Sequence, residues 1–245
     1  MSAPLLEIVA VPAFADNYIW LVREPASGEV AVVDPGDGAA TLAAADELGW
    51  RIGTVLITHW HPDHTGGIGQ VVAATGAAVF GPEAERSRFA GLQHGLSDGD
   101  TVKLGQQAAA VWAVPGHTLG HIAYIFADAG VAFVGDTMFA LGCGRLFEGS
   151  AEQMHASLQR LGTLPDPTLI YCAHEYTLSN ARFAAHAEPE NEATAARLAA
   201  VEAARQRGEP TVPSSLADER ATNPFLRART AAEFASLRQA KDSFR

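Results

Sequence analysis

The chain lacks several features that define whole classes of protein. Its 245 residues include only two cysteines, Cys143 and Cys172, too few for a disulfide framework, and this fits a reducing compartment. No apolar run approaches the roughly 18 residues of a membrane span, and no basic leader precedes the first cation, Arg23. We therefore expect a soluble, cytoplasmic protein with no membrane partner.

Positive charge is also scarce. The chain carries 17 Lys and Arg against 28 Asp and Glu, a formal net charge of −11. Nucleic-acid binding needs a basic surface, so we expect no nucleic-acid partner. The segment 175–245 differs, because it holds ten Lys and Arg against ten Asp and Glu. That balance is typical of an ordinary helical surface, or of a segment that supplies cations to an anionic substrate.

Charged residues make up only 18% of the chain and apolar residues 48%, which predicts a large core. Strands and helices alternate up to about residue 174, with hairpins such as Ile122–Phe126 with Val131–Val134. This order predicts an α/β sandwich of mixed sheets with helices outside. Later apolar spacing is helical, most clearly over Glu192–Arg207. We predict one domain over 1–174 and a small helical domain over 175–245.

Turn and capping residues predict several element boundaries. A helix over Ile68–Thr75 should end at Gly76. A second helix should begin at Ser150, with Gln153 completing a capping box. The Asp98–Asp100 stretch, with its central glycine, predicts a hairpin-like turn.

What the chain does contain is a dense run of metal-binding side chains after the apolar residues Val55–Ile57. His59, His61, Asp63 and His64 fall within six residues. Imidazole and carboxylate ligands suit zinc, and also iron or manganese. A structural zinc site would use cysteines, and none is near. The pattern therefore predicts a catalytic metal held on a loop at the edge of a sheet.

Three further candidate ligands stand where other predicted strands end: His117, Asp136 and His174. Alone, each also fits a structural role, such as a turn cap for Asp136. Together the candidates number seven, which is too many for one tetrahedral ion and suits two metals about 3.5–4 Å apart. We predict that one ion is held by His59, His61 and His117 and the other by Asp63, His64 and His174. Asp136 is predicted to bridge both ions through its two oxygens.

The motif Thr58–His64 resembles the signature of the metallo-β-lactamase superfamily, and the three later ligands occur in that superfamily's order. Within it, the chain is similar to the glyoxalase II (hydroxyacylglutathione hydrolase) family from about residue 7 to the C-terminus. The segments that carry this closer resemblance are Phe14–Trp20, Gly142–Gly149, His174–Thr177 and Leu226–Phe244.

The resemblance implies an αββα sandwich, here the catalytic domain over 1–174, followed by a helical substrate-binding domain over 175–245. It implies hydrolysis of S-(2-hydroxyacyl)glutathione, such as S-D-lactoylglutathione, to glutathione and D-lactate in methylglyoxal detoxification. It also implies two divalent metal ions, with zinc expected first and iron or manganese as alternatives. The substrate contacts that it implies are Arg145, Phe147, Tyr176, Arg238 and Lys241.

Two of those positions depart from other members of the family. Arg145 and Phe147 replace the Lys and Tyr found in some of them, so a cation is kept at 145 and a phenol hydroxyl is lost at 147. The mechanistic hypothesis is attack on the thioester by a hydroxide that bridges two metals. Asp63 and Asp136 are the expected catalytic carboxylates, and Asp63 is also expected to orient the nucleophile.

Other residues near these motifs receive structural interpretations. His121 is expected either to support a ligand through a hydrogen bond or to be structural, and Asp34 either supports a ligand or forms a turn before its proline. Cys143 has no evident base nearby and is interpreted as structural.

Alternative functions remain open at this point. One is a glutathione persulfide dioxygenase with a single iron, which would leave half of the ligands unused. Others are a lactonase and a non-catalytic, metal-stabilised interaction protein. We expect a monomer acting on a small glutathione thioester.

Overall fold

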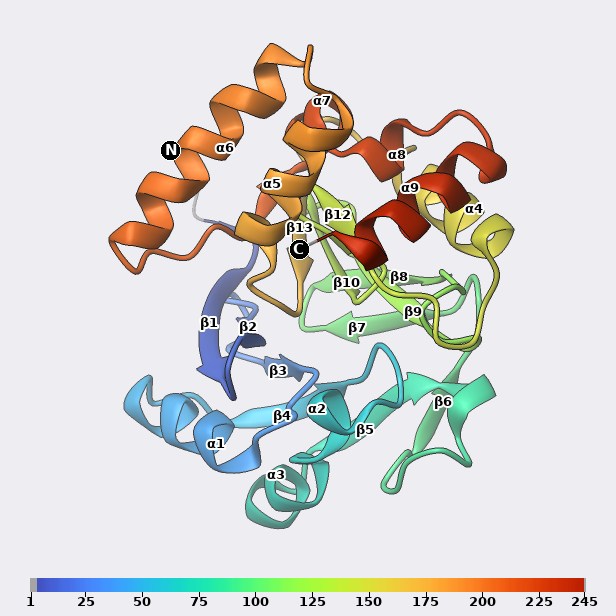
Figure 1. Ribbon diagram of the computed structural model, residues 1–245. Coiled ribbons are helices and arrows are strands. Elements are labelled where there is room, and N and C mark those ends of the chain that lie inside the picture. Colours follow the sequence, from blue (N-terminus) through green and yellow to red (C-terminus); the bar gives the residue numbers. More distant parts are fainter. Residues whose placement is uncertain (1–3, 245) are drawn as a thin grey trace. The chain divides into compact units, whose positions relative to one another are not determined.

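The computed structural model describes residues 4–244, which fall into two compact units (Figure 1). Unit 1 comprises the chain up to Ala113 together with Gly120–Gly135. Unit 2 comprises Val114–Leu119 and the chain from Asp136 onward. The boundary predicted at residue 174 from composition divides the chain differently and stays a prediction.

Unit 1 contains a six-stranded mixed sheet in the order β1-β2-β3-β4-β5-β6. Its strands are β1 (Glu7–Ala13), β2 (Asn17–Arg23), β3 (Val30–Val33), β4 (Ile52–Leu56), β5 (Ala78–Pro82) and β6 (His94–Leu96). The first three pair antiparallel because short turns join them, whereas β3 to β6 pair parallel and need longer crossovers. The mixed α/β organisation predicted from the sequence is confirmed.

Helices in these crossovers cover the sheet. They are α1 (Gly38–Glu47), α2 (Pro62–Thr65) and α3 (Ile68–Thr75), followed after β5 by the short 3₁₀ helix η1 (Glu83–Glu85). Helices α1 and α3 lie side by side (Figure 1), and their apolar residues join a core with Leu21, Val32 and Val55. These three side chains are fully buried, and truncating such residues costs about 1–4 kcal/mol. As predicted, α3 ends at Gly76, whose φ of 73° favours glycine.

Four more strands of unit 1 form an antiparallel meander. They are β7 (Thr101–Leu104), β8 (Gln107–Ala113), β9 (Ile122–Phe126) and β10 (Val131–Gly135). The predicted hairpin of β9 and β10 is confirmed, with Val131 opposite Phe126. The turn at Asp98–Asp100 is present, but the hairpin interpretation is wrong, because β6 and β7 belong to different sheets. The hairpin here is β7–β8.

Unit 2 is mainly helical, with two short antiparallel strand pairs. Its helices are α4 (Ala151–Leu161), α5 (Thr177–Ala187), α6 (Glu192–Gln206), α7 (Leu216–Thr222), α8 (Pro224–Arg227) and α9 (Ala231–Ser243). Its strands are β11 (Met138–Phe139), β12 (Gly142–Cys143), β13 (Leu169–Cys172) and β14 (Ser214–Ser215). Helix α4 lies beside α9, and α5 beside α6 (Figure 1). No helix within residues 4–244 is both long and apolar enough to cross a bilayer.

Side chains at the ends of the helices fix the loops of unit 2. Ser150 and Gln153 form the predicted capping box at the start of α4. The buried Asn223 donates from Nδ2 to the Gly142 carbonyl at 2.9 Å, and Glu219 accepts from the Leu141 amide at 2.9 Å. Helices near the C-terminus therefore hold the loop before Arg145. A truncation at residue 175 would remove these anchors and most of unit 2.

Candidate metal centre

In unit 1, the segment that leads from β4 into the His59–His64 loop is fixed by β9. The Tyr124 hydroxyl donates to the Ile57 carbonyl at 2.8 Å, and the Ile122 amide donates to the Thr58 carbonyl at 2.9 Å. Burial raises the pKa of the Tyr124 phenol well above its usual value, so the hydroxyl stays protonated as a donor. The backbone just before His59 is therefore held by the sheet, and this fixes where the loop begins.

Asp34, directly after β3, accepts three hydrogen bonds from residues of this loop. It accepts from the Thr58 amide at 2.8 Å, from the Thr58 hydroxyl at 2.7 Å, and from His64 Nδ1 at 3.0 Å. Asp34 is buried, and its φ of 51° lies in the left-handed region, which costs backbone strain for a residue other than glycine. Of the two interpretations left open for Asp34, the structure supports the role of partner to a ligand.

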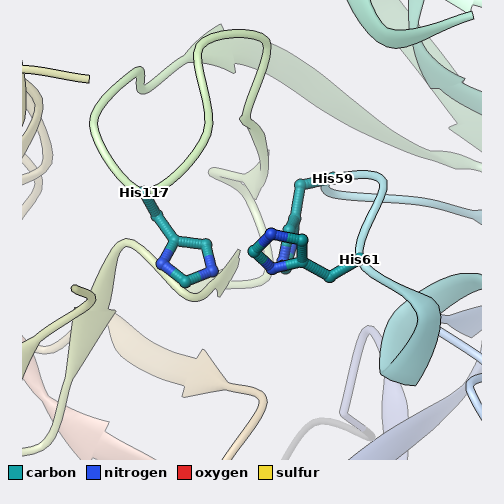
Figure 2. Close-up of side chains that lie close together, drawn as sticks. All are labelled: His59, His61 and His117. Atoms are coloured by element: carbon teal, nitrogen blue, oxygen red, sulfur yellow. The ribbon is translucent and has the colours of Figure 1, made fainter. Parts of the chain in front are cut away.

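These hydrogen bonds fix which ring nitrogens carry protons. Since a carboxylate only accepts, His64 carries its proton on Nδ1 and leaves Nε2 as a lone pair. The Thr58 hydroxyl donates its one proton to Asp34, so at 3.1 Å it accepts from His59 Nδ1. His59 Nε2 then faces His61 Nδ1 at 3.1 Å, as the two rings in Figure 2 show. The buried His121 ring stacks on His59 at 4.6 Å and supports it from its face.

Asp63 is positioned by the start of α2, where Pro62 occupies the first turn. Its Oδ2 accepts from Asn17 Nδ2 at 3.0 Å and lies 3.4 Å from His64 Nε2. Gly36 lets the backbone pass close by, because a Cβ at that position would overlap the Asp63 carbonyl. The loop after β3 and the start of β2 thus place this carboxylate beside the His64 lone pair.

Unit 2 contains the other three candidate ligands, and they lie together. Oδ2 of Asp136 is 3.4 Å from His117 Nε2 and 3.4 Å from His174 Nε2. All three residues are at most 6% exposed. His117, whose ring Figure 2 also draws, has Nδ1 at 2.9 Å from the Arg145 carbonyl, so its proton is on Nδ1 and Nε2 is the lone pair. A single Asp136 oxygen, Oδ2, faces both imidazoles, whereas the sequence prediction used both oxygens.

The spacing of these atoms fits metal binding. For bonds of about 2.1 Å, neighbouring ligands of a tetrahedral ion lie about 3.4 Å apart. The nitrogen and oxygen pairs within each unit lie 3.1 to 3.4 Å apart. Imidazole and carboxylate donors suit zinc, iron or manganese, and outer hydrogen bonds fix the tautomers of His59, His64 and His117. Each unit therefore carries a set of side chains suited to hold divalent metal.

Aromatic side chains in unit 2 pack against its two imidazoles. The Tyr176 ring stacks on His174 with centroids 4.6 Å apart and planes 3° apart. The Phe147 ring meets His117 edge-on at 5.2 Å. Tyr176 is 37% exposed and Phe147 62% exposed. Because each packs beside a candidate ligand and still faces outward, both are placed to contact a bound molecule.

The predicted cations of unit 2 differ in accessibility. Arg238 is buried, with Nη1 donating to the Cys143 carbonyl at 3.0 Å and Nη2 to Asp242 at 2.7 Å. Arg145 is exposed. Half-buried Lys241 donates to the Ser179 hydroxyl at 2.8 Å. Burial, then the charges of Arg238 and Arg145, lower the pKa of Lys241 to about 8. These positive charges therefore repel one another, and an anion would relieve that repulsion.

Cys143 lies in this loop and is not activated. Burial raises the pKa of its thiol to about 11, although the Arg238 charge opposes this. A thiol of that kind is uncharged at neutral pH and is a poor nucleophile. Gly144 is also structural, because a Cβ there would overlap the Asp136 carbonyl. The structural interpretation of Cys143 is supported.

Sequence reasoning missed three residues that support the candidate ligands. Asn17 and Glu175 were noted only inside family segments, and Thr58 only as part of the motif. Each acts through a hydrogen bond to a residue distant in the sequence. Thr58 and Glu175 stand next to candidate ligands in the sequence, which was the available signal, and Asn17 carried none.

Two known family profiles together match residues 14–244 of the chain. The sequence profile of the metallo-β-lactamase superfamily matches residues 14–174, and that of the hydroxyacylglutathione hydrolase C-terminus matches residues 175–244. A hydroxyacylglutathione hydrolase of Methylococcus capsulatus is 49% identical, over 98% of this chain and all of the relative.

Solved structures are similar at lower identity. The crystal structure of ETHE1 from Myxococcus xanthus superposes with a TM-score of 0.73 at 26% identity, covering 96% of this chain and 89% of that one. TTHA1623, solved in a di-iron-bound form, superposes with a TM-score of 0.57 at 26% identity, covering 69% of this chain and 91% of that one.

Proposed function

The chain belongs to the hydroxyacylglutathione hydrolase family of the metallo-β-lactamase superfamily, and from this we propose that it hydrolyses S-(2-hydroxyacyl)glutathione thioesters. The products are glutathione and a 2-hydroxy acid, as in the conversion of S-D-lactoylglutathione to D-lactate during methylglyoxal detoxification. The observation that carries the proposal is the 49% identity over essentially the full length of both proteins. In this account, residues 1–174 supply the chemistry and residues 175–245 help to bind glutathione.

We propose that the ligands of both units serve one two-metal centre. His59, His61 and His117 would hold one ion, Asp63, His64 and His174 the other, and Asp136 would bridge. The spacing and tautomers within each unit support this assignment. The di-iron form of TTHA1623 supports two metals and keeps iron beside zinc as a candidate.

When bound, two divalent ions supply Lewis acidity, which lowers the pKa of a water to about 7 and polarises a carbonyl. The protein's own groups prepare this chemistry. Asn17 and the α2 turn fix Asp63, so that its carboxylate can orient the attacking water. His64 and His117 donate from Nδ1 to Asp34 and to the Arg145 carbonyl, and these hydrogen bonds keep their Nε2 atoms aimed as ligands. The leaving glutathione thiolate needs no strong acid, because it is a far better leaving group than an amine.

Glutathione carries two carboxylates, and the cations of unit 2 suit them. We propose that Arg145 and Lys241 contact these carboxylates. We propose that Arg238 adds charge while holding the loop of Cys143. Tyr176 and Phe147 would flank the thioester end of the substrate, beside His174 and His117. Phe147 offers an apolar ring edge here and no hydroxyl.

The proposed function is tested by assaying metal-loaded protein on S-D-lactoylglutathione without oxygen. We expect thioester cleavage with release of free glutathione thiol. A persulfide dioxygenase would need oxygen and would consume it with glutathione persulfide, and a lactonase would prefer an acyl lactone. If fully metallated protein cleaves no thioester, the proposal fails and a non-catalytic interaction protein becomes the better explanation.

The pKa of Lys241 predicts a pH dependence of substrate binding. Its ammonium is charged below a pKa of about 8 and loses its proton as the pH rises through that value. Attraction for the substrate carboxylates is therefore present below pH 8 and lost above it. We expect kcat/KM for S-D-lactoylglutathione to fall about fivefold between pH 7 and pH 9.5 from this group. The Lys241→Met variant should lose this inflection; an unchanged profile would contradict the assignment.

Location and assembly are further parts of the proposal. Both cysteines are buried free thiols, which fits a reducing cytoplasm where glutathione is abundant. We propose that the protein acts there as a monomer. Light scattering of the purified protein gives the mass in solution directly.

A further inference from the structure

Glu175 lies between two residues of the proposed site and takes no part in the chemistry proposed above. On one side His174 faces Asp136, and on the other Tyr176 lies at the start of α5. The rings of His174 and Tyr176 are parallel, and the Phe139 ring packs edge-on against both, at 5.9 and 5.2 Å. Glu175 therefore belongs to the short stretch of backbone that carries both rings.

The Glu175 side chain points to a different part of unit 2. Its carboxylate accepts from the Thr211 amide at 2.9 Å and also from the Thr211 hydroxyl. Arg205, in the last turn of α6, approaches the same carboxylate at 3.5 Å. The Glu175 side chain is only 8% exposed. A buried charge held by this many donors has few alternative positions.

Thr211 and Arg205 belong to one connected segment. Arg205 also donates to the Glu209 carbonyl at 2.6 Å, which closes the turn that follows α6. Helix α6 packs on α5, the helix that starts directly after Tyr176. The segment 205–211 thus holds the Glu175 side chain, and Glu175 stands between the two residues that carry the rings.

We propose that Glu175 is a positioning residue that sets His174 and Tyr176 for metal and substrate binding through its bonds to Thr211 and Arg205. The inference rests on the proposed function for its roles of His174 and Tyr176. If the Glu175 carboxylate is lost, the 174–176 backbone gains freedom. The His174 nitrogen and the Tyr176 ring then no longer meet their partners in one fixed geometry.

The test compares Glu175→Gln with Glu202→Gln, a matched control. Glu202 lies on α6 and pairs with Arg182 at 3.4 Å, but that pair is exposed. In Glu175→Gln we expect the second equivalent of Zn²⁺, in competition with a chelator, to bind about 10-fold to 100-fold more weakly. The first equivalent should bind as in wild type. We also expect KM for S-D-lactoylglutathione to rise several-fold.

A second variant separates positioning from simple loss of stability. Thr211→Val removes a hydroxyl donor and touches neither ring, so it should shift Zn²⁺ affinity and KM in the same direction by a smaller factor. If both variants lower only the melting temperature, and leave Zn²⁺ affinity and KM at 25 °C as in Glu202→Gln, the inference is overturned. Absence of thioester hydrolysis by the wild type would instead count against the proposed function, because the Zn²⁺ readout does not depend on turnover.

Discussion

Asp136→Ala is expected to lower hydrolysis of S-D-lactoylglutathione by about a thousandfold and to reduce bound metal below two ions per chain. One Asp136 oxygen lies 3.4 Å from both His117 and His174, so its loss removes the negative charge between the two imidazoles of unit 2. Metal sites contribute several kcal/mol of charge stabilisation, and about 1.4 kcal/mol corresponds to a tenfold change in rate. Metal content by elemental analysis and kcat/KM measure the two effects.

A control variant shows whether the effect is specific to Asp136 or follows from the loss of any carboxylate in unit 2. Asp166→Ala removes another carboxylate of unit 2, one that is exposed and pairs with Arg220 at 2.6 Å. It should keep metal and activity. Circular dichroism of both variants checks that they are folded. If Asp136→Ala retained wild-type metal content and rate, Asp136 would not be a bridging ligand.

The second large effect is expected from two cations of unit 2, the exposed Arg145 and the half-buried Lys241. Replacing Arg145 and Lys241 together by methionine should raise KM for S-D-lactoylglutathione by about 100-fold with little change in kcat. Hydrogen bonds to charged groups contribute about 1.5–3 kcal/mol each, and 1.4 kcal/mol is tenfold in affinity. Because the carboxylates of glutathione are remote from the thioester, these contacts act on binding more than on the chemical step.

A small substrate separates glutathione recognition from general damage. A lactoyl thioester of N-acetylcysteamine has no carboxylate, so the double variant should hydrolyse it as the wild type does. Arg229→Met, which removes an exposed cation just before α9, should affect neither substrate. An equal loss on both thioesters would mean that Arg145 and Lys241 support the fold and do not recognise glutathione.

Local sequence signals predicted several elements of the fold. Gly76, the capping box at Ser150 and the hairpin of β9 and β10 depend on residues close in sequence, and all three are confirmed. Short strands such as β6 and β7 carry too few residues to show a period, and neither was predicted. The turn between them was found, but its neighbours in the sheets depend on long-range pairing.

The candidate ligands were predictable for a related reason. The run His59–His64 and the three later ligands each follow an apolar strand within a few residues, a pattern visible in the sequence. The residues that orient them are not marked in this way. Asn17 and Asp63 are 46 positions apart, and Glu175 and Thr211 are 36 apart. Hydrogen bonds across such distances depend on how the elements fold together, and no local pattern records them.

The central claim is that two metals and a glutathione thioester meet at one site, and a metal titration tests it most directly. Metal-free protein is titrated with Zn²⁺ while hydrolysis of S-D-lactoylglutathione is followed. We predict that the rate rises until two equivalents are bound and then levels off. A rate that levels off at one equivalent, or no hydrolysis when two are bound, would contradict the account.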